Sequence, residues 1–144
     1  YWHAMARNIE PRNGIYYWRE GVIWRDQATT LQDSKAAKRT DELFTAGMNV
    51  NPYDIANHIE RIRLHRDHRN LLEKPAALEE LLVWAERVYA RSPHSRGVQL
   101  EYVHALAFSG KTQKALLLAK QMQSKNPGSK VIKKLISDLE QGGY

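Results

Sequence analysis

Apolar residues recur along this chain with the three- and four-residue spacing of amphipathic α-helices. In the last third of the chain the stripes are Tyr102, Val103 and Leu106, then Ala115, Leu118, Ala119 and Met122. They predict one helix over about 95–108 and a second over 112–125. Gly110 lies between them and suits the left-handed position that ends helices. Because helices this short are marginal alone in water, the two are predicted to pack as a hairpin.

Prolines divide the chain into segments with the same pattern. Pro11, Pro52 and Pro93 follow one another at 41 residues (52 − 11 and 93 − 52), and Pro127 follows at 34 (127 − 93). Two residues after each proline stands a side chain that can cap a helix: Asn13, Asp54, Ser95 and Ser129. Proline ends the preceding helix, and Asn, Asp or Ser accepts from N–H groups in the next helix's first turn. The spacing therefore predicts four junctions of one kind.

The first two units are each longer than the third by seven residues (41 − 34). The excess lies at 28–36 and 69–78, between the first and second helix of each unit. Seven residues make about two helical turns, so the excess either adds a turn to each helix or forms a longer loop. Asp33-Ser34 and Lys74-Pro75 resemble helix starts, and Pro75 suits the first turn.

The segment Glu10–Gly21 resembles the start of a tetratricopeptide repeat (TPR). In that family a Pro-x-Asn opening leads to an aromatic residue and then to a small residue four positions later. In this chain the aromatic residue is Tyr17 and the small residue is Gly21. Later positions that match the family are Trp24, Phe44, Gly47 and Ala115. The resemblance implies an all-α, right-handed superhelix of antiparallel helical hairpins with a C-terminal capping helix.

On this basis the whole chain, 1–144, is expected to be a single TPR-like domain. Its parts are the second helix of a truncated repeat at 1–10, long repeats at 11–51 and 52–92, a third repeat at 93–126, and a cap helix and tail at 127–144. The apolar positions of the cap helix are Val131, Ile132, Leu135, Ile136 and Leu139. Because the segment 1–10 corresponds only to the second helix of a repeat, we expect the parent protein to continue upstream.

The middle unit departs from the family pattern. His58 and Arg61 stand where large apolar residues are usual, and the apolar stripe is instead Ile55, Ile59 and Ile62. A second resemblance concerns the junction 51–54, Asn-Pro-Tyr-Asp, set among basic helical hairpins without cysteine. It is similar to the soluble C-terminal region of bacterial O-antigen ligase or polymerase-like membrane proteins. That resemblance implies a periplasmic location, with the cytoplasm as the alternative.

Composition adds little chemistry to this picture. The chain has Lys+Arg 22, Asp+Glu 16, a net charge of +6 and no cysteine, and no apolar run is long enough to span a bilayer. No phosphate-binding loop, nucleophile elbow or zinc signature occurs. The six histidines are His3, His58, His65, His68, His94 and His104. They are predicted to be surface or groove residues, so no metal site, cofactor or catalytic residue is expected.

The TPR resemblance implies that first helices line a concave groove. The groove residues would be Ile15, Trp18, Val22, Arg25, Ile59, Arg63, Arg66, Leu100, His104 and Phe108. Apolar anchors mixed with guanidinium groups are typical of a peptide-binding surface. The alternative is that the aromatics pack one hairpin on the next, and that the arginines at 61, 63, 66 and 69 form a solvated face. Trp18 and Val22 stand where the family's carboxylate clamp uses Lys and Asn, so that activity is not implied.

The expected function is a non-catalytic interaction or scaffold module within a larger protein, which binds a protein or peptide partner, with an acidic partner among the candidates. One alternative is an accessory periplasmic domain of a glycan ligase or polymerase membrane enzyme. The other is a helical-repeat RNA-binding module, which the +6 charge would favour. Nucleic acid is the less expected partner because acids are interleaved with the basic residues and no repeated base-reading pair occurs.

Overall fold

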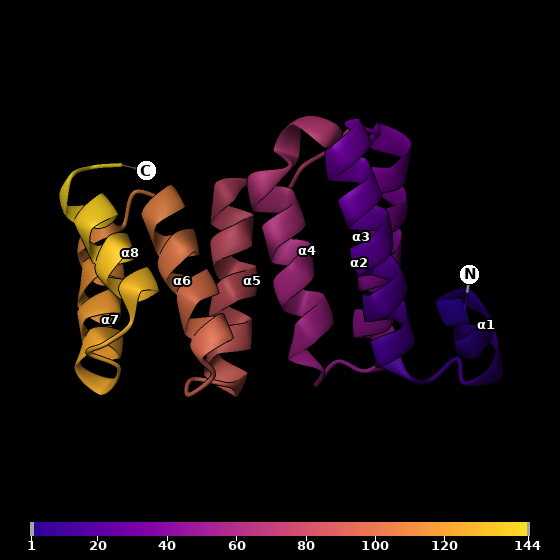
Figure 1. Cartoon of the computed structure of the whole chain (residues 1–144), viewed down its shortest axis with the longest axis horizontal. Coiled ribbons are helices and arrows are strands. Elements are labelled where there is room, and N and C mark those ends of the chain that lie inside the picture. The colour runs from indigo at the N-terminus through magenta and orange to yellow at the C-terminus, as the bar shows by residue number, and fades with distance from the viewer. Residues whose placement is uncertain (1, 144) are drawn as a thin grey trace. The chain divides into compact units, whose positions relative to one another are not determined.

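The computed structural model describes residues 2–143, which form α-helices and one short 3-10 helix, with no strand among them (Figure 1). The chain divides into two compact units, the N-terminal unit (1–76) and the C-terminal unit (77–144). The first contains α1 (Trp2–Ile9), α2 (Gly14–Leu31), α3 (Ser34–Val50), α4 (Ile55–Asp67) and η1 (Arg69–Leu71). The second contains α5 (Leu78–Arg91), α6 (Arg96–Phe108), α7 (Thr112–Lys125) and α8 (Lys130–Glu140). The described chain is all-α, as the apolar periodicity predicted.

The four proline junctions are confirmed in atomic detail. The capping side chains of Asn13, Asp54, Ser95 and Ser129 accept hydrogen bonds from the backbone N–H of Ile15, Ala56, Val98 and Ile132. Asp33 caps α3 in the same way, accepting from the N–H groups of residues 35 and 36. Gly110 has φ +73°, the left-handed conformation expected between α6 and α7. Each junction therefore ends one helix and begins the next through local chemistry alone.

In the N-terminal unit, α2 packs on α1, α3 and α4, and α3 also packs on α4. Phe44 of α3 is fully buried, and its ring occupies the space where a Cβ at Gly21 of α2 would lie. The absent side chain of Gly21 thus allows α2 and α3 to approach closely. Both residues are among those that carry the TPR resemblance.

A buried asparagine ties three helices of this unit together. Asn57 of α4 is fully buried and donates from Nδ2 to the carbonyl of Gly14, at the start of α2, over 3.1 Å. A Cβ at Gly47, near the end of α3, would collide with the same amide group. Asn57 therefore fixes α4 against α2 and α3, a role that the apolar pattern did not predict.

The seven extra residues are accommodated differently in the two long repeats. In the first, both helices are extended: α2 and α3 have 18 and 17 residues, against 13 and 14 in α6 and α7. In the second, α4 and α5 have 13 and 14 residues, and the excess forms η1 and an extended connector, residues 72–77. Helix extension is thus found once and the longer loop once.

The prediction that α5 begins near Pro75 is wrong. The helix begins at Leu78, and Pro75 lies in the connector. The reason is that side chains bind the connector's backbone: Ala76 N–H donates to His65 Nδ1 over 2.9 Å, and Ala76 O accepts from Arg69 Nη1 over 2.6 Å. These bonds engage both the N–H and the carbonyl of Ala76, so neither group is free for the bonds of a helix that begins at Pro75.

In the C-terminal unit each helix packs on the next, α5 on α6, α6 on α7 and α7 on α8. The apolar residues predicted for α7 and α8 are buried, apart from one: Ala115, Leu118, Ala119, Met122, Ile132, Leu135, Ile136 and Leu139. Val131 is the exception, with 58% of its surface exposed. Its side chain is therefore not part of the packed face of α8, and its assignment to that face is corrected.

Candidate functional site

The predicted groove residues of α2 form one stripe on that helix. Ile15, Trp18, Val22 and Arg25 follow at spacings of three, four and three residues, which places them along one side of an α-helix. Ile15 is 40% exposed, and Trp18 and Val22 are half-buried. An indole and two aliphatic side chains are therefore accessible to solvent in one row, which we call the α2 stripe.

Two of the predicted groove arginines converge on one buried carboxylate. The side chain of Glu60 on α4 is only 10% exposed; its Oε2 is bonded to Arg25 Nη1, and its Oε1 lies 2.8 Å from Arg63 Nη1. Because Arg25 belongs to α2, this ion pair joins the two first helices at the end of the α2 stripe. The structure thus brings Arg25 and Arg63 together, through a glutamate that the sequence reasoning missed. The only sequence feature that could have indicated Glu60 is its position three residues before Arg63, the spacing of an ion pair within one helix.

The other predicted groove residues are placed less uniformly. Ile59 is buried, with 8% of its surface exposed, and the Arg66 side chain is 9% exposed and pairs with Asp67 at 2.7 Å. Leu100, His104 and Phe108 lie in the C-terminal unit, on one side of α6 at spacings of four. Leu100 and His104 are half-buried, and Phe108 is 39% exposed. Within its own unit, α6 therefore also presents a stripe of partly accessible side chains.

A second buried glutamate joins three helices of the N-terminal unit. Glu20 of α2 is 8% exposed and pairs with Arg7 of α1 at 3.0 Å and with Arg39 of α3 at 3.6 Å. Arg7 also lies over the ring of Tyr17, 5.3 Å from its centroid. The buried carboxylates of α2 and α4 therefore each pair with an arginine from at least one neighbouring helix.

The expectation that His65 is a surface or groove residue is wrong. Its side chain is 4% exposed, and both ring nitrogens are bonded: Nε2 to Asp41 Oδ1 at 2.8 Å, and Nδ1 to the Ala76 N–H. Because Ala76 is a donor, Nδ1 accepts and the ring proton lies on Nε2. Since both nitrogens are engaged, this histidine has a structural role.

Asp41 lies at the centre of this cluster, bonded also to Arg61 Nε at 2.7 Å. Burial raises the pKa of Asp41, but the hydrogen bonds from His65 and Arg61, with the charge of Arg61, outweigh it and lower the pKa below the usual 3.8. The ionised carboxylate of Asp41 therefore stabilises the folded state above its usual pKa. This stabilisation is lost as the pH falls through the lowered pKa. Among the residues that the structure describes, no group of His, Cys, Asp or Glu could hold a metal ion.

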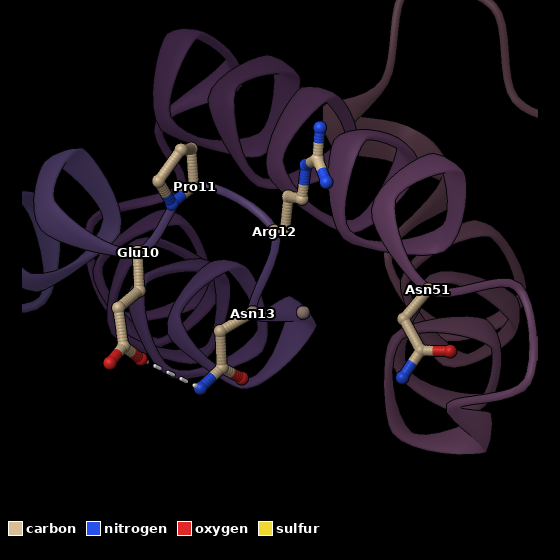
Figure 2. A pocket seen from close by; sticks show the side chains of 6 residues that line it. Glu10, Pro11, Arg12, Asn13 and Asn51 are labelled. Carbon is tan, nitrogen blue, oxygen red and sulfur yellow. Dashed lines mark hydrogen bonds between the residues drawn. The ribbon is translucent and has the colours of Figure 1, made fainter.

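Open hollows occur at the proline junctions. One, of about 580 Å³, is lined by Glu10, Pro11, Arg12, Asn13, Gly14 and Asn51. Figure 2 shows Glu10 and Asn13 pointing to the same side, joined by a 3.3 Å hydrogen bond. A similar hollow of about 530 Å³ surrounds the junction at Pro127. Because two junctions of the same kind produce similar hollows, we attribute them to the junction geometry rather than to a ligand site.

Comparison of the chain with protein-family models, with curated proteins and with solved structures finds no match in any of the three. Among the described helices none is both long and apolar enough to cross a membrane. The candidate site is consequently defined by geometry alone. It consists of the α2 stripe and the Arg25–Glu60–Arg63 ion pair beside it.

The Glu60 ion pair gives a testable prediction about stability. Glu60→Ala should lower the free energy of unfolding by about 1–3 kcal/mol, since two guanidinium groups lose a buried acceptor while remaining partly solvated. Glu60→Gln keeps the shape and one acceptor oxygen and should cost less. Urea unfolding followed by circular dichroism measures both changes. Equal stabilities of the wild type and the alanine variant would contradict the ion pair.

Proposed function

We propose that this chain is a TPR-like, non-catalytic protein-interaction module that binds a peptide or protein through its first helices. The observation that carries the proposal is the α2 stripe. It presents Trp18 between two accessible aliphatic side chains, with the Arg25–Glu60–Arg63 ion pair at one end. Partly exposed aromatic residues beside arginines are enriched at the energetic centres of protein interfaces. The superhelical stacking of TPR hairpins is part of the same proposal.

The chemistry of the α2 stripe defines what it would bind. The accessible row is apolar for about two helical turns, from Ile15 to Val22, and becomes charged at Arg25. A partner that fits it carries an apolar side chain to cover the indole and a polar or acidic group near the guanidinium groups. Arg25 donates to Asp26 and Glu60 through all three of its nitrogens, so the partner's polar group is expected near Arg63, whose side chain is 37% exposed. Arginine forks select carboxylates by paired hydrogen bonds, so an acidic residue near the apolar anchor is the expected feature of the partner.

Peptides selected from a random displayed library provide the test. Trp18→Ala should weaken a selected peptide by at least about tenfold, the loss expected when a central aromatic anchor is truncated. Ile23→Ala is the matched control, because Ile23 is on the same helix, is 51% exposed and lies outside the α2 stripe. Binding is measured by calorimetry, and circular dichroism confirms that both variants are folded.

Two outcomes would refute the proposal. One is a set of selected peptides that bind the Trp18→Ala variant as tightly as the wild type. The other is an equal loss in the Ile23→Ala control, which would show that α2 contributes through general hydrophobicity and not through the stripe. Arg63→Ala is a poorer probe than Trp18→Ala, because Arg63 also bonds the buried Glu60.

A further inference from the structure

The positive charge of this protein is concentrated near its C-terminus. Residues 109–144 contain seven lysines and two acids, Asp138 and Glu140, a net +5 of the total +6. Residues 1–108 contain 15 basic and 14 acidic side chains. The expectation of basic residues interleaved with acids therefore holds for the first three quarters of the chain and fails for the rest. No acid at all occurs between Glu101 and Asp138.

All seven of these lysines are exposed on α7, α8 and the turns beside them. We call them the lysine face: Lys111, Lys114, Lys120, Lys125, Lys130, Lys133 and Lys134. Two are paired with acids along the hairpin, Lys120 with Glu140 at 3.1 Å and Lys134 with Asp138 at 2.8 Å. At the α7–α8 turn, by contrast, Lys125 and Lys130 line one hollow with Arg96 and no acid lines it.

Two exposed aliphatic side chains are set among the lysines. Leu117 is 62% exposed and follows Lys114 by three residues, on the same side of α7. Val131 is 58% exposed and lies beside Lys130 at the α7–α8 turn. Apolar residues surrounded by lysine are the composition of surfaces that lie against a charged bilayer interface.

We propose that the lysine face docks on an anionic lipid membrane surface. Lysine ammonium groups on flexible stems suit a diffuse layer of headgroup phosphates, which requires charge and no fixed geometry. Leu117 and Val131 would enter the boundary between headgroups and acyl chains. The segment 109–143 contains no arginine and no aromatic residue, the residue types that read and stack nucleic-acid bases. A lipid surface therefore fits this face better than a nucleic acid does.

Vesicle flotation with the 144-residue chain tests the proposal. The chain should float with vesicles containing about 30% phosphatidylserine at about 50 mM NaCl, and should detach at about 500 mM, where screening is strong. It should not float with pure phosphatidylcholine. The variant Lys114→Gln/Lys125→Gln/Lys130→Gln should bind the anionic vesicles on the order of 100-fold more weakly, since each lysine contributes about fivefold.

The matched control is Lys35→Gln/Lys38→Gln/Lys74→Gln. It changes the net charge equally, from +6 to +3, at three exposed lysines of the N-terminal unit. The control should retain binding within about threefold, because it leaves the lysine face unchanged. Exposed charges that lie more than a Debye length from the membrane are largely screened from it. Circular dichroism and thermal unfolding of both triple variants verify the fold. An equal loss in the two triple variants would overturn the lysine face as the docking site.

Further outcomes separate a lipid from other polyanions. Leu117→Ser/Val131→Ser should weaken vesicle binding several-fold and leave binding to a short RNA duplex unchanged, since only the bilayer offers an apolar phase. Tighter binding to the duplex than to the anionic vesicles would overturn the proposal in favour of a nucleic acid. No flotation at low salt would overturn it outright. Trp18→Ala should not affect flotation, so this proposal can fail independently of the proposed function.

Discussion

Phe44→Ala is expected to lower the free energy of unfolding by about 3–5 kcal/mol, the cost of removing a buried aromatic side chain and leaving a cavity. Phe44 is fully buried, and its ring fills the space left by Gly21. Urea unfolding followed by circular dichroism measures the change. Leu31→Ala on α2, where the leucine is 66% exposed, is the control and should change stability by no more than about 0.5 kcal/mol. Similar values for the two variants would contradict this packing.

A double-mutant cycle isolates the contact between the two helices. Gly21→Ala alone should be destabilising, because the new Cβ overlaps the fully buried ring of Phe44. Phe44→Leu shortens the side chain and should accommodate the added methyl group. The double variant is therefore expected to be less destabilised than the sum of the single variants. Strict additivity would show that the ring and the glycine do not constrain each other.

The parts of the fold that the sequence predicted are those determined within a few residues. A proline followed by a capping side chain ends one helix and begins the next without help from the rest of the chain. Asn13, Asp54, Ser95 and Ser129 therefore cap the expected helices. The same holds for Gly110, whose left-handed conformation depends only on its own backbone.

The parts that could not be predicted depend on contacts between residues distant in sequence. Nothing local shows that seven extra residues lengthen the helices of one repeat and form a connector in the next. The difference lies in His65 and Arg69, which bind the backbone of Ala76. Likewise, the bond of Arg25 to Glu60 spans 35 residues, so a predicted groove arginine is also an internal ion-pair partner.

The candidate site was therefore predicted in outline and not in its electrostatics. Helical spacing alone places Ile15, Trp18 and Val22 on one side of α2, but burial of a glutamate beside them follows from how α2 and α4 pack. The lysine face differs, because the absence of acids between Glu101 and Asp138 can be read directly from the sequence. The net charge of the whole chain does not reveal the lysine face, but the net charge of each segment of the sequence does.

His65→Ala is expected to release the connector, residues 72–77, and to destabilise the N-terminal unit by about 2–4 kcal/mol. The variant removes the acceptor for the Ala76 N–H and a donor to Asp41, and leaves a cavity at a buried position. Limited proteolysis should cut the connector at least about tenfold faster than in the wild type, because local opening becomes more frequent. His94→Ala, at an exposed histidine of the C-terminal unit, should leave the rate unchanged.

The same variant should also alter the response to acid. The hydrogen bond from His65 helps to lower the pKa of Asp41 below 3.8. Without His65 that pKa should rise towards its usual value, so less stability depends on the ionised carboxylate. The wild type gains stability from Asp41 above its usual pKa and loses it as the pH falls, and His65→Ala should show a shallower loss below about pH 4. An unchanged acid profile together with unchanged proteolysis would show that His65 does not hold the connector.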